Sequence, residues 1–388
     1  MAFDLISVDD HIIEPPNVWT DRLPAQHREA GPHVVEAEGR QYWEYEGERS
    51  STMGLNAVAG KENKEFSMDP TSYDEMIPGC YDPVQRGKDL LKDGIRGSVC
   101  FPTFPRFAGV TFLKADDKQL AHLCVKAYND FILDEWAASV PGLYIPMIIG
   151  QLWDPSAMAE EIRRCAARGA RAVTFPENPA ALGEPSFHTR HWDPVWQAVT
   201  ETDIAVCMHI GTSGVMAMPS ADASFAIGIA IANVNSISAL SDLIMSEIPH
   251  RFPEIKIAIS EGGIGWVPFA LERCDRTWEK HRYWAEGISD VRPSEAFARN
   301  IWVCFIEERA GIEMRHIIGV DKIMWECDYP HADTPWPYSQ KAVAESLHGV
   351  PQDEVDLITH GNAERLFRWD ERPDPAALGV QTPGIKTE

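Results

Sequence analysis

The sequence predicts an α/β protein of the (β/α)8 barrel class. Eight short apolar runs rich in Ile and Val recur along the 388 residues, and Gly, Pro or polar clusters bound each run. Such runs are typical of strands that are buried on both faces of a parallel sheet. Amphipathic segments of helical period follow them. This alternation favours a closed barrel without edge strands, and a doubly wound open sheet is the second interpretation.

The predicted elements follow from these patterns in chain order. Pro155 after Asp154 indicates a helix start, and Gly169 and Gly349 stand where helices end. The predicted strands are residues 3–11, 95–103, 142–151, 170–178, 203–211, 254–263, 300–308 and 321–330. The predicted helices are residues 116–140, 155–169, 193–202, 234–252, 266–282 and 340–349, with a closing helix at 359–367 that docks Phe367 on the barrel.

Two segments break the alternation, and we expect a single domain over residues 1–388 that carries both. Residues 33–50 alternate apolar and polar side chains around Gly39, which predicts a β-hairpin inserted after the first strand. Residues 51–76 lack periodicity. The whole insertion, 33–76, is therefore a candidate lid over the barrel mouth. The Pro-rich tail, 370–388, is expected to be loose or to lie on a neighbouring subunit of a homodimer or tetramer.

Charge and cysteine usage narrow the possible partners. The chain has 59 acidic and 35 basic side chains and a net charge of −24, which disfavours nucleic acid and anionic membranes as partners. The eight cysteines form no CxxC pair and several stand in apolar runs, as expected in a reducing compartment. No signal peptide is visible, and no apolar stretch approaches the ~18 residues needed to span a bilayer. We therefore expect a cytoplasmic protein.

Acidic and histidine side chains, which can bind a metal ion or transfer a proton, lie at the ends of several predicted strands. Asp9 and His11 are two residues apart on the first strand, so that alternation puts them on one face together with Leu5 and Ser7. An acid and an imidazole so placed can bind one divalent cation, or they can form a structural pair. His209 ends the fifth strand, and Asp328 ends the eighth. Because buried acids are costly without compensation, convergence of these four side chains predicts a metal site.

The motifs "VDDHIIEP", "MHIG", "EGGIGW" and "CDYPH" resemble the amidohydrolase superfamily, over nearly the whole chain. The fuller likeness is to the amidohydrolase-related branch that includes aminocarboxymuconate semialdehyde decarboxylase. The resemblance implies a (β/α)8 barrel, one divalent metal ion, and either non-oxidative decarboxylation or hydrolysis. It also implies that Asp328 handles protons as well as the metal.

Two positions depart from the pattern of that superfamily. Asp9 stands where the hydrolases have a first His, although some decarboxylases of the branch have a Glu there. A carboxylate at this position favours a harder ion such as Mn²⁺ alongside Zn²⁺. Glu261 ends the sixth strand where a His is usual. It is a candidate proton acceptor or further ligand, and the alternative is a structural pair with an arginine.

Four other residues are candidates with a structural alternative for each. His331 is expected to touch the substrate or orient Asp328, or else to cap its loop. Arg106 is a candidate clamp for a substrate carboxylate, or a surface arginine packed on Phe104. Glu177 is expected to line the pocket or to anchor a loop. Trp325 is expected in an aromatic pocket or in the core.

The leading hypothesis is metal-dependent, non-oxidative decarboxylation of a small aromatic or conjugated carboxylic acid. In this reaction protonated Asp328 delivers a proton to the carbon that loses CO2. The first alternative is hydrolysis of a C–N, C–O or activated C–C bond through metal-bound water, with Asp328 as base. The second alternative is a non-catalytic barrel that binds a small molecule.

Overall fold

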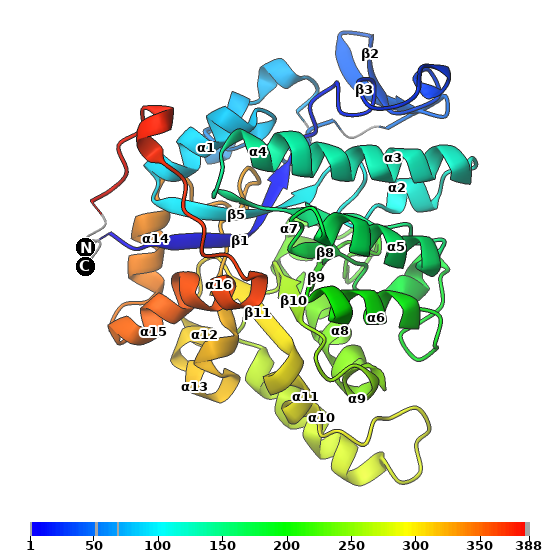
Figure 1. Cartoon of the computed structure of the whole chain (residues 1–388). Coiled ribbons are helices and arrows are strands. Elements are labelled where there is room, and N and C mark those ends of the chain that lie inside the picture. Colours follow the sequence, from blue (N-terminus) through cyan, green and yellow to red (C-terminus); the bar gives the residue numbers. More distant parts are fainter. Residues whose placement is uncertain (1, 51–52, 68–69, 385–388) are drawn as a thin grey trace.

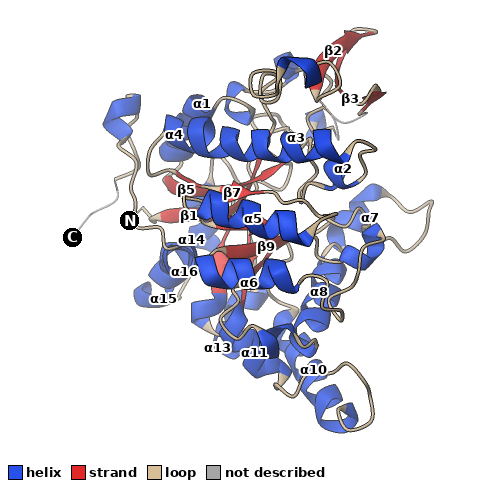
Figure 2. Ribbon diagram, turned by 45° about the vertical axis from the view of Figure 1, so that its right-hand side comes forward, coloured by secondary structure: helices blue, strands red, loops and turns tan. Residues whose placement is uncertain are grey.

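The computed structural model describes residues 2–50, 53–67 and 70–384 and shows an α/β protein with parallel strands at its centre and helices around them (Figures 1 and 2). Each of the eight predicted strand regions overlaps at least one of these central strands. The central strands are β1 (Leu5–Ile12), β5 (Ile95–Pro102), β6 (Tyr144–Ile145), β7 (Met147–Ile148), β8 (Ala172–Thr174), β9 (Ala205–His209), β10 (Ile257–Ser260), β11 (Ile301–Phe305) and β12 (Ile323–Trp325).

The helices lie mainly between successive strands along the chain. Asp82, Asp117 and Asp154 each accept backbone N–H groups at a helix start, which stabilises α1, α3 and α5. The helices are α1 (Pro83–Lys92), α2 (Val110–Leu113), α3 (Lys118–Phe131), α4 (Ala137–Ser139), α5 (Pro155–Ala166), α6 (Asp193–Thr202), α7 (Phe225–Ala230), α8 (Asn233–Met245), α9 (Ile248–Arg251), α10 (Val267–His281), α11 (Pro293–Asn300), α12 (Ala310–Glu313), α13 (Arg315–Ile318), α14 (Ser339–Ser346), α15 (Gln352–Asp356) and α16 (Asn362–Phe367).

The central strands pair in parallel in two series, β1-β5-β6 and β12-β11-β10-β9-β8-β7. A single residue, Pro146, separates β6 from β7, and its carbonyl accepts the backbone N–H of Arg171. At the other end, the backbone N–H of Asp328 donates to the Asp9 carbonyl at 2.8 Å. Backbone contacts therefore bring the segment after β12 against β1.

A register shift in β1 decides where its acidic side chains point. Leu5 packs in the outer core between strands and helices, whereas Ile6 and Val8 pack in the inner core with Phe101. Strict alternation would then turn Asp9 outward with Leu5. The pairing of β1 with β5 is irregular between Ser7 and Asp10, and such bulges re-aim side chains. The expected common face of Leu5, Ser7, Asp9 and His11 is therefore wrong, although Asp9 and His11 do lie together.

The segment after β1 contains an antiparallel sheet of three strands, β2 (His33–Ala37), β3 (Arg40–Tyr45) and β4 (Glu48–Arg49). Further along, the backbone N–H groups of Val58 and Ala59 both donate to the Pro330 carbonyl at 3.0 Å. This part of the segment thus lies against the loop that follows β12. Of the expected loop over 51–76, residues 51–52 and 68–69 lie outside the described residues.

The tail packs on its own chain. The Trp369 indole N–H donates to the Gly142 carbonyl at 3.2 Å, and Arg372 pairs with Asp4 at 3.0 Å. Leu378 lies against Gly87 of α1. Apolar and ionic contacts therefore hold part of the tail on α1 and on the segment before β1, while a contact of the tail with a neighbouring subunit stays a prediction. Residues 385–388 lie outside the described residues.

One helical segment, Phe225–Met245, is long and apolar enough to cross a membrane by length and composition, with a mean hydropathy of 1.5. The expectation that no stretch approaches this length is therefore wrong. Core helices of soluble proteins pass the same test, and 39% of the most apolar 18-residue window of this segment is buried in the protein.

Candidate metal centre

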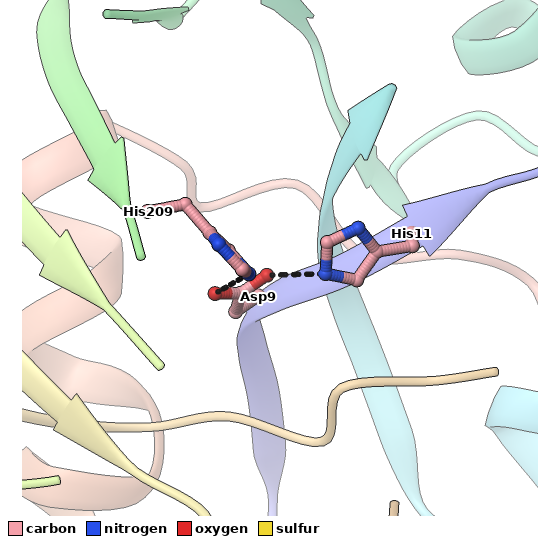
Figure 3. Close-up of side chains that lie close together, drawn as sticks. All are labelled: Asp9, His11 and His209. Atoms are coloured by element: carbon pink, nitrogen blue, oxygen red, sulfur yellow. Dashed lines mark ion pairs between the residues drawn. The ribbon is translucent and has the colours of Figure 1, made fainter. Parts of the chain in front are cut away.

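Four of the predicted site residues meet at the carboxyl ends of the central strands. Asp9 and His11 come from β1, His209 is the last residue of β9, and Asp328 lies three residues after β12. Each of the four side chains is at most 1% exposed. Figure 3 shows Asp9 between the imidazoles of His11 and His209. Residues far apart in the sequence thus form one buried cluster.

The distances in the cluster suit ligands of a shared ion. His11 Nε2 lies 3.4 Å from Asp9 Oδ1 and 3.3 Å from Asp328 Oδ1, and His209 Nε2 lies 3.5 Å from Asp9 Oδ2. One ligand atom from each of Asp9, His11 and His209 lies within 4.8 Å of the others, and the same holds for His11, Asp328 and His331. These separations exceed hydrogen-bond lengths but match neighbouring ligand atoms around one metal ion.

The hydrogen-bonding state of these atoms tests whether a cation fits. Among the described residues, neither carboxylate oxygen of Asp9 and neither ring nitrogen of His11 has a hydrogen-bond partner, although both side chains are fully buried. Buried polar groups without partners are costly, and an unpaired buried carboxylate costs most. A divalent cation bound by these atoms would remove that cost, so the donor set fits a metal ion.

The imidazoles are held in orientations that leave a nitrogen for the ion. His209 Nδ1 lies 2.6 Å from its neighbour's carbonyl, on Ile210, so this nitrogen carries the proton and Nε2 faces the cluster. The His11 ring stacks on His331 at 3.8 Å and contacts Phe107 at 4.6 Å. The buried Arg86 guanidinium donates to the His11 carbonyl at 2.6 Å, which fixes the backbone there.

Glu261 contacts the cluster rather than an arginine. Its Oε2 lies 2.6 Å from His209 Nε2. The Glu261 carboxylate is therefore close enough to act as a metal ligand or as a proton acceptor. Both Glu261 and Asp328 have positive φ angles, 53° and 57°. A non-glycine residue rarely adopts this conformation, and such strain is concentrated at functional sites.

Burial and like charges shift the pKa values of the cluster. Burial, together with the carboxylates of Glu326 and Glu261, raises the pKa of Asp9 well above its ordinary value. Burial and Glu261 likewise raise the pKa of Asp328. Burial lowers the pKa of His11, and it lowers the pKa of His331 to about 4. Both imidazoles are therefore neutral at pH 7, the state in which imidazole binds metal.

His331 lies beside Asp328, with its Nδ1 2.9 Å from Asp328 Oδ1. This contact matches the predicted orienting position. Glu326 was not among the predicted residues, but it is 1% exposed and lies at the same strand end. Its Oε2 accepts the Glu261 backbone N–H at 3.2 Å and the Cys304 thiol at 2.6 Å. Its position directly before the "CDYPH" motif was a sequence signal for it.

A cavity of about 360 Å³ opens beside Glu261. Its walls include apolar side chains such as Met216, Ile229 and Phe305, and no lysine or arginine is among the described residues that line it. A neighbouring cavity of about 970 Å³ is lined by His331 and also by Lys61. The carboxylates that line the first cavity are those of Glu261, Glu307, Glu308, Glu326 and Asp333.

The three predicted substrate-binding residues lie elsewhere. Arg106 is exposed and lines a different cavity, beside the β3–β4 hairpin. Trp325 is buried in the outer core, where its indole N–H donates to the Ile306 carbonyl at 3.2 Å, because its strand position faces the helices. Glu177 accepts the Ser213 hydroxyl at 2.7 Å and also bonds Thr212, as the loop-anchoring alternative expects. None of the three joins the metal cluster.

The sequence profile of the amidohydrolase family matches residues 69–369. The chain belongs to the amidohydrolase family. The predicted resemblance is thereby confirmed. No curated protein matches the chain.

Solved structures with the same fold cover nearly the whole chain. An amidohydrolase from Mycobacterium avium subsp. paratuberculosis K-10 is 20% identical, with a TM-score of 0.73 over 95% of this chain and 100% of its own. The 5-carboxyvanillate decarboxylase of Sphingomonas paucimobilis is 20% identical, with a TM-score of 0.65 over 95% and 100% of the two chains. The 5-carboxyvanillate decarboxylase of Novosphingobium aromaticivorans, described with bound manganese, is 16% identical, with a TM-score of 0.66 over 94% and 96%.

Proposed function

We propose that this protein is a metal-dependent decarboxylase of small aromatic carboxylic acids, built as one closed (β/α)8 barrel domain. The hydrogen bond from Asp328 to Asp9 and the single-residue break at Pro146 support closure of the strand series. In this proposal the hairpin of β2 to β4 and the described residues of 53–76 belong to an insertion beside the barrel mouth. Similar structures of decarboxylases of 5-carboxyvanillate and 2,6-dihydroxybenzoate support the reaction class.

The observation that carries the proposal is the buried cluster of Asp9, His11, His209 and Asp328. We assign these four side chains as the ligands of one Mn²⁺ or Zn²⁺ ion. The carboxylates of Asp9 and Asp328 favour the harder Mn²⁺, and a solved decarboxylase of this fold is described with manganese. The bound ion neutralises negative charge and orients a chelating substrate.

The residues around the ion provide the proton chemistry. Decarboxylation of an aromatic acid requires a proton at the ring carbon that carries the carboxylate. Asp328 is the proposed donor, because burial and Glu261 raise its pKa and favour its protonated form. His331, 2.9 Å away, orients the Asp328 carboxyl group. After proton transfer, the C–C bond to the carboxylate breaks, its electron pair restores the aromatic ring, and CO2 leaves.

The cavity walls restrict the substrate. Since no lysine or arginine is among the described residues that line the cavity beside Glu261, binding of a substrate carboxylate there depends on the ion. An acid with a hydroxyl group next to its carboxylate offers two oxygens to the ion, and we propose substrates of this kind. The apolar side chains of Met216 and Phe305 provide contacts for an aromatic ring.

We further propose that the enzyme is cytoplasmic. All eight cysteines are buried and unpaired, as expected where thiols stay reduced. Its net charge of −24 supports small molecules rather than nucleic acid or an anionic membrane as partners.

Product analysis tests the proposed reaction. The Mn²⁺-loaded protein is incubated with ortho-hydroxy aromatic acids, including 5-carboxyvanillate and 2,6-dihydroxybenzoate, in D2O. The expected products are CO2 and a phenol with one deuterium at the carbon that carried the carboxylate. A panel of esters, amides and lactones is run in parallel. Turnover of those compounds to new carboxylic acids without CO2 would establish hydrolysis instead.

A further inference from the structure

A buried arginine contacts the backbone beside the proposed metal centre. Arg86 of α1 is fully buried. Among the residues that the structure describes, each hydrogen bond of its guanidinium goes to a backbone carbonyl, and its Nη1 has no partner. A buried charge is costly unless it is paired, and apolar side chains of similar volume can often replace buried charged groups without loss of stability. Packing alone therefore does not account for a charged residue at this position.

The Arg86 guanidinium joins the end of β1 to the segment before α1. Its Nη2 donates to the His11 carbonyl at 2.6 Å and to the Cys80 carbonyl at 3.3 Å, and its Nε donates to the Gly79 carbonyl at 2.6 Å. Gly79 and Cys80 belong to η4 (Pro78–Cys80), the short helix that directly precedes α1. One side chain thus holds three backbone carbonyls, and one of them belongs to a proposed metal ligand.

The same guanidinium lies against the residue that follows Asp328. It stands 4.3 Å from the centre of the Tyr329 ring, a distance at which a cation is attracted to an aromatic face. The Tyr329 hydroxyl donates to Asp89 Oδ2 at 3.1 Å, three residues further along α1. A Cβ at Gly79 would collide with both of these oxygens, so that only glycine permits the close approach. Helix α1 therefore holds the Tyr329 side chain at two points.

Backbone hydrogen bonds connect these two anchored segments to the proposed ligands. The Asp328 N–H donates to the Asp9 carbonyl at 2.8 Å, and the His11 N–H donates to the Tyr329 carbonyl at 2.7 Å. The Asp10 carboxylate accepts the Tyr329 N–H at 3.0 Å. Three of the four proposed ligands therefore lie on two backbone segments, and the guanidinium contacts one segment at His11 and the other at Tyr329.

We infer that Arg86 is a positioning residue of the metal centre. It holds the two segments at the spacing that lets Asp9, His11 and Asp328 bind one ion, and it acts through these residues rather than on the ion. Its planar guanidinium binds several carbonyls and packs on an aromatic ring at the same time, which the single ammonium group of a lysine cannot do. The inference rests on the proposed metal site, but it does not depend on which reaction the site carries out.

The metal affinity of the full chain tests the inference. Arg86→Lys keeps the charge but loses the planar fork, and it is expected to weaken Mn²⁺ binding by about 10- to 100-fold, the range seen for groups that orient metal ligands. Leu90→Ala, at a fully buried site on the same helix, is the matched control for lost stability and should bind Mn²⁺ as wild type does. Electron paramagnetic resonance measures the free ion. The spectrum of the bound ion gives a second readout, because it depends on the symmetry of the ligands.

Circular dichroism and urea unfolding of the metal-free proteins establish that each variant is folded in the titration. A folded Arg86→Lys protein with the wild-type dissociation constant and spectrum would overturn the inference. An equal loss of affinity in Leu90→Ala would overturn it too, because lost stability would then explain the effect. A wild-type protein that binds no Mn²⁺ would refute the proposed metal site itself, and the inference with it.

A milder variant keeps the test open if Arg86→Lys does not fold. Tyr329→Phe retains the ring beside the guanidinium and loses only the hydroxyl that donates to Asp89. Its dissociation constant for Mn²⁺ should rise by at least about 2-fold, the effect of one lost hydrogen bond. An unchanged constant in this variant would overturn the inference. None of these measurements depends on catalytic turnover.

Discussion

His209 Nε2 lies 2.6 Å from Glu261 Oε2, while the same nitrogen lies 3.5 Å from Asp9 Oδ2. The carboxylate that stands in place of the usual sixth-strand histidine therefore touches a proposed metal ligand directly. Burial lowers the pKa of His209, but the Glu261 carboxylate outweighs it and the net pKa is raised. Because Nε2 is also the nitrogen that would bind the ion, Glu261 lies within reach of the ion itself and is a candidate further ligand.

Replacement of Glu261 by Gln removes a negative charge beside the proposed ion and should weaken Mn²⁺ binding by about 10- to 100-fold, the size of effect seen for groups that support a metal site. Electron paramagnetic resonance of free Mn²⁺ measures the affinity. Glu307→Gln is the matched control, because this residue lines the same cavity and forms no ion pair with any residue in the described part of the chain. Equal affinity in wild type and Glu261→Gln would show that Glu261 does not support the ion.

Replacement of His11 by Ala should abolish stoichiometric metal binding. His11 Nε2 lies 3.4 Å from Asp9 Oδ1 and 3.3 Å from Asp328 Oδ1. The substitution therefore removes one proposed metal ligand and leaves the two carboxylates without this imidazole beside them. Elemental analysis of protein purified without chelators gives the metal content per chain. Exposed His348→Ala should retain the wild-type content. A His11→Ala protein with one tightly held ion per chain would contradict the assignment.

Replacement of Asp328 by Asn should lower kcat by about 10²- to 10⁴-fold, the usual contribution of a positioned proton donor. The amide keeps an oxygen for the ion but cannot deliver the proton. The rate has to be compared at measured, equal metal content. A variant with the full rate and a full complement of metal would remove Asp328 from the reaction.

Replacement of Asp4 by Asn should lower stability at neutral pH and flatten its acid dependence. Burial raises the pKa of Asp4, but Arg96 at 2.6 Å outweighs it and the net pKa is lowered. A carboxyl group whose pKa is lowered by folding stabilises the protein at pH values above the pKa that the group has in the unfolded chain. This stabilisation is lost as the pH falls through the pKa of the folded state.

The expected loss for Asp4→Asn at pH 7 is about 1–2 kcal/mol, measured as the free energy of unfolding in urea. The difference from wild type should begin to shrink as the pH falls below about 4, where the carboxyl group of the unfolded chain takes up its proton, and it should vanish once the pH is below the folded pKa. Asp370→Asn, at an exposed site in the tail, should change neither quantity. A difference that stays constant down to pH 3.5 would exclude the ion pair as its source.

Replacement of Phe367 by Ala should destabilise the fold by about 3–5 kcal/mol, as expected for loss of a buried ring. Phe367 is fully buried and packs with Ile6 and Val8 in the inner core, so α16 covers the end of the central strands away from the proposed metal ligands. Thermal unfolding of the metal-free proteins measures the effect. Phe269→Ala, at a site that is 68% exposed, should cost less than about 1 kcal/mol.

The sequence alone was enough to predict the family, the eight strand regions and the convergence of Asp9, His11, His209 and Asp328, whereas their role as metal ligands stays a prediction. This was possible because buried parallel strands need apolar runs, and because acids and imidazoles at the ends of such runs are costly without a shared partner. The docked Phe367 was predictable for the same reason, as an apolar residue in a closing amphipathic helix.

The tertiary structure decided the features that depend on contacts between distant segments. The bulge in β1 turns Asp9 toward His209, and no pattern in "LISVDDHI" shows that shift. Arg106 and Trp325 stand at strand ends in the sequence, yet one reaches solvent and the other faces the helices, because strand twist and register set the direction of a side chain. Glu326 lies beside Glu261 because β12, β11 and β10 are consecutive strands of one sheet. Residue types and their spacing are local properties of the chain. The direction of a side chain, its burial and its contact partners depend on how the strands pair.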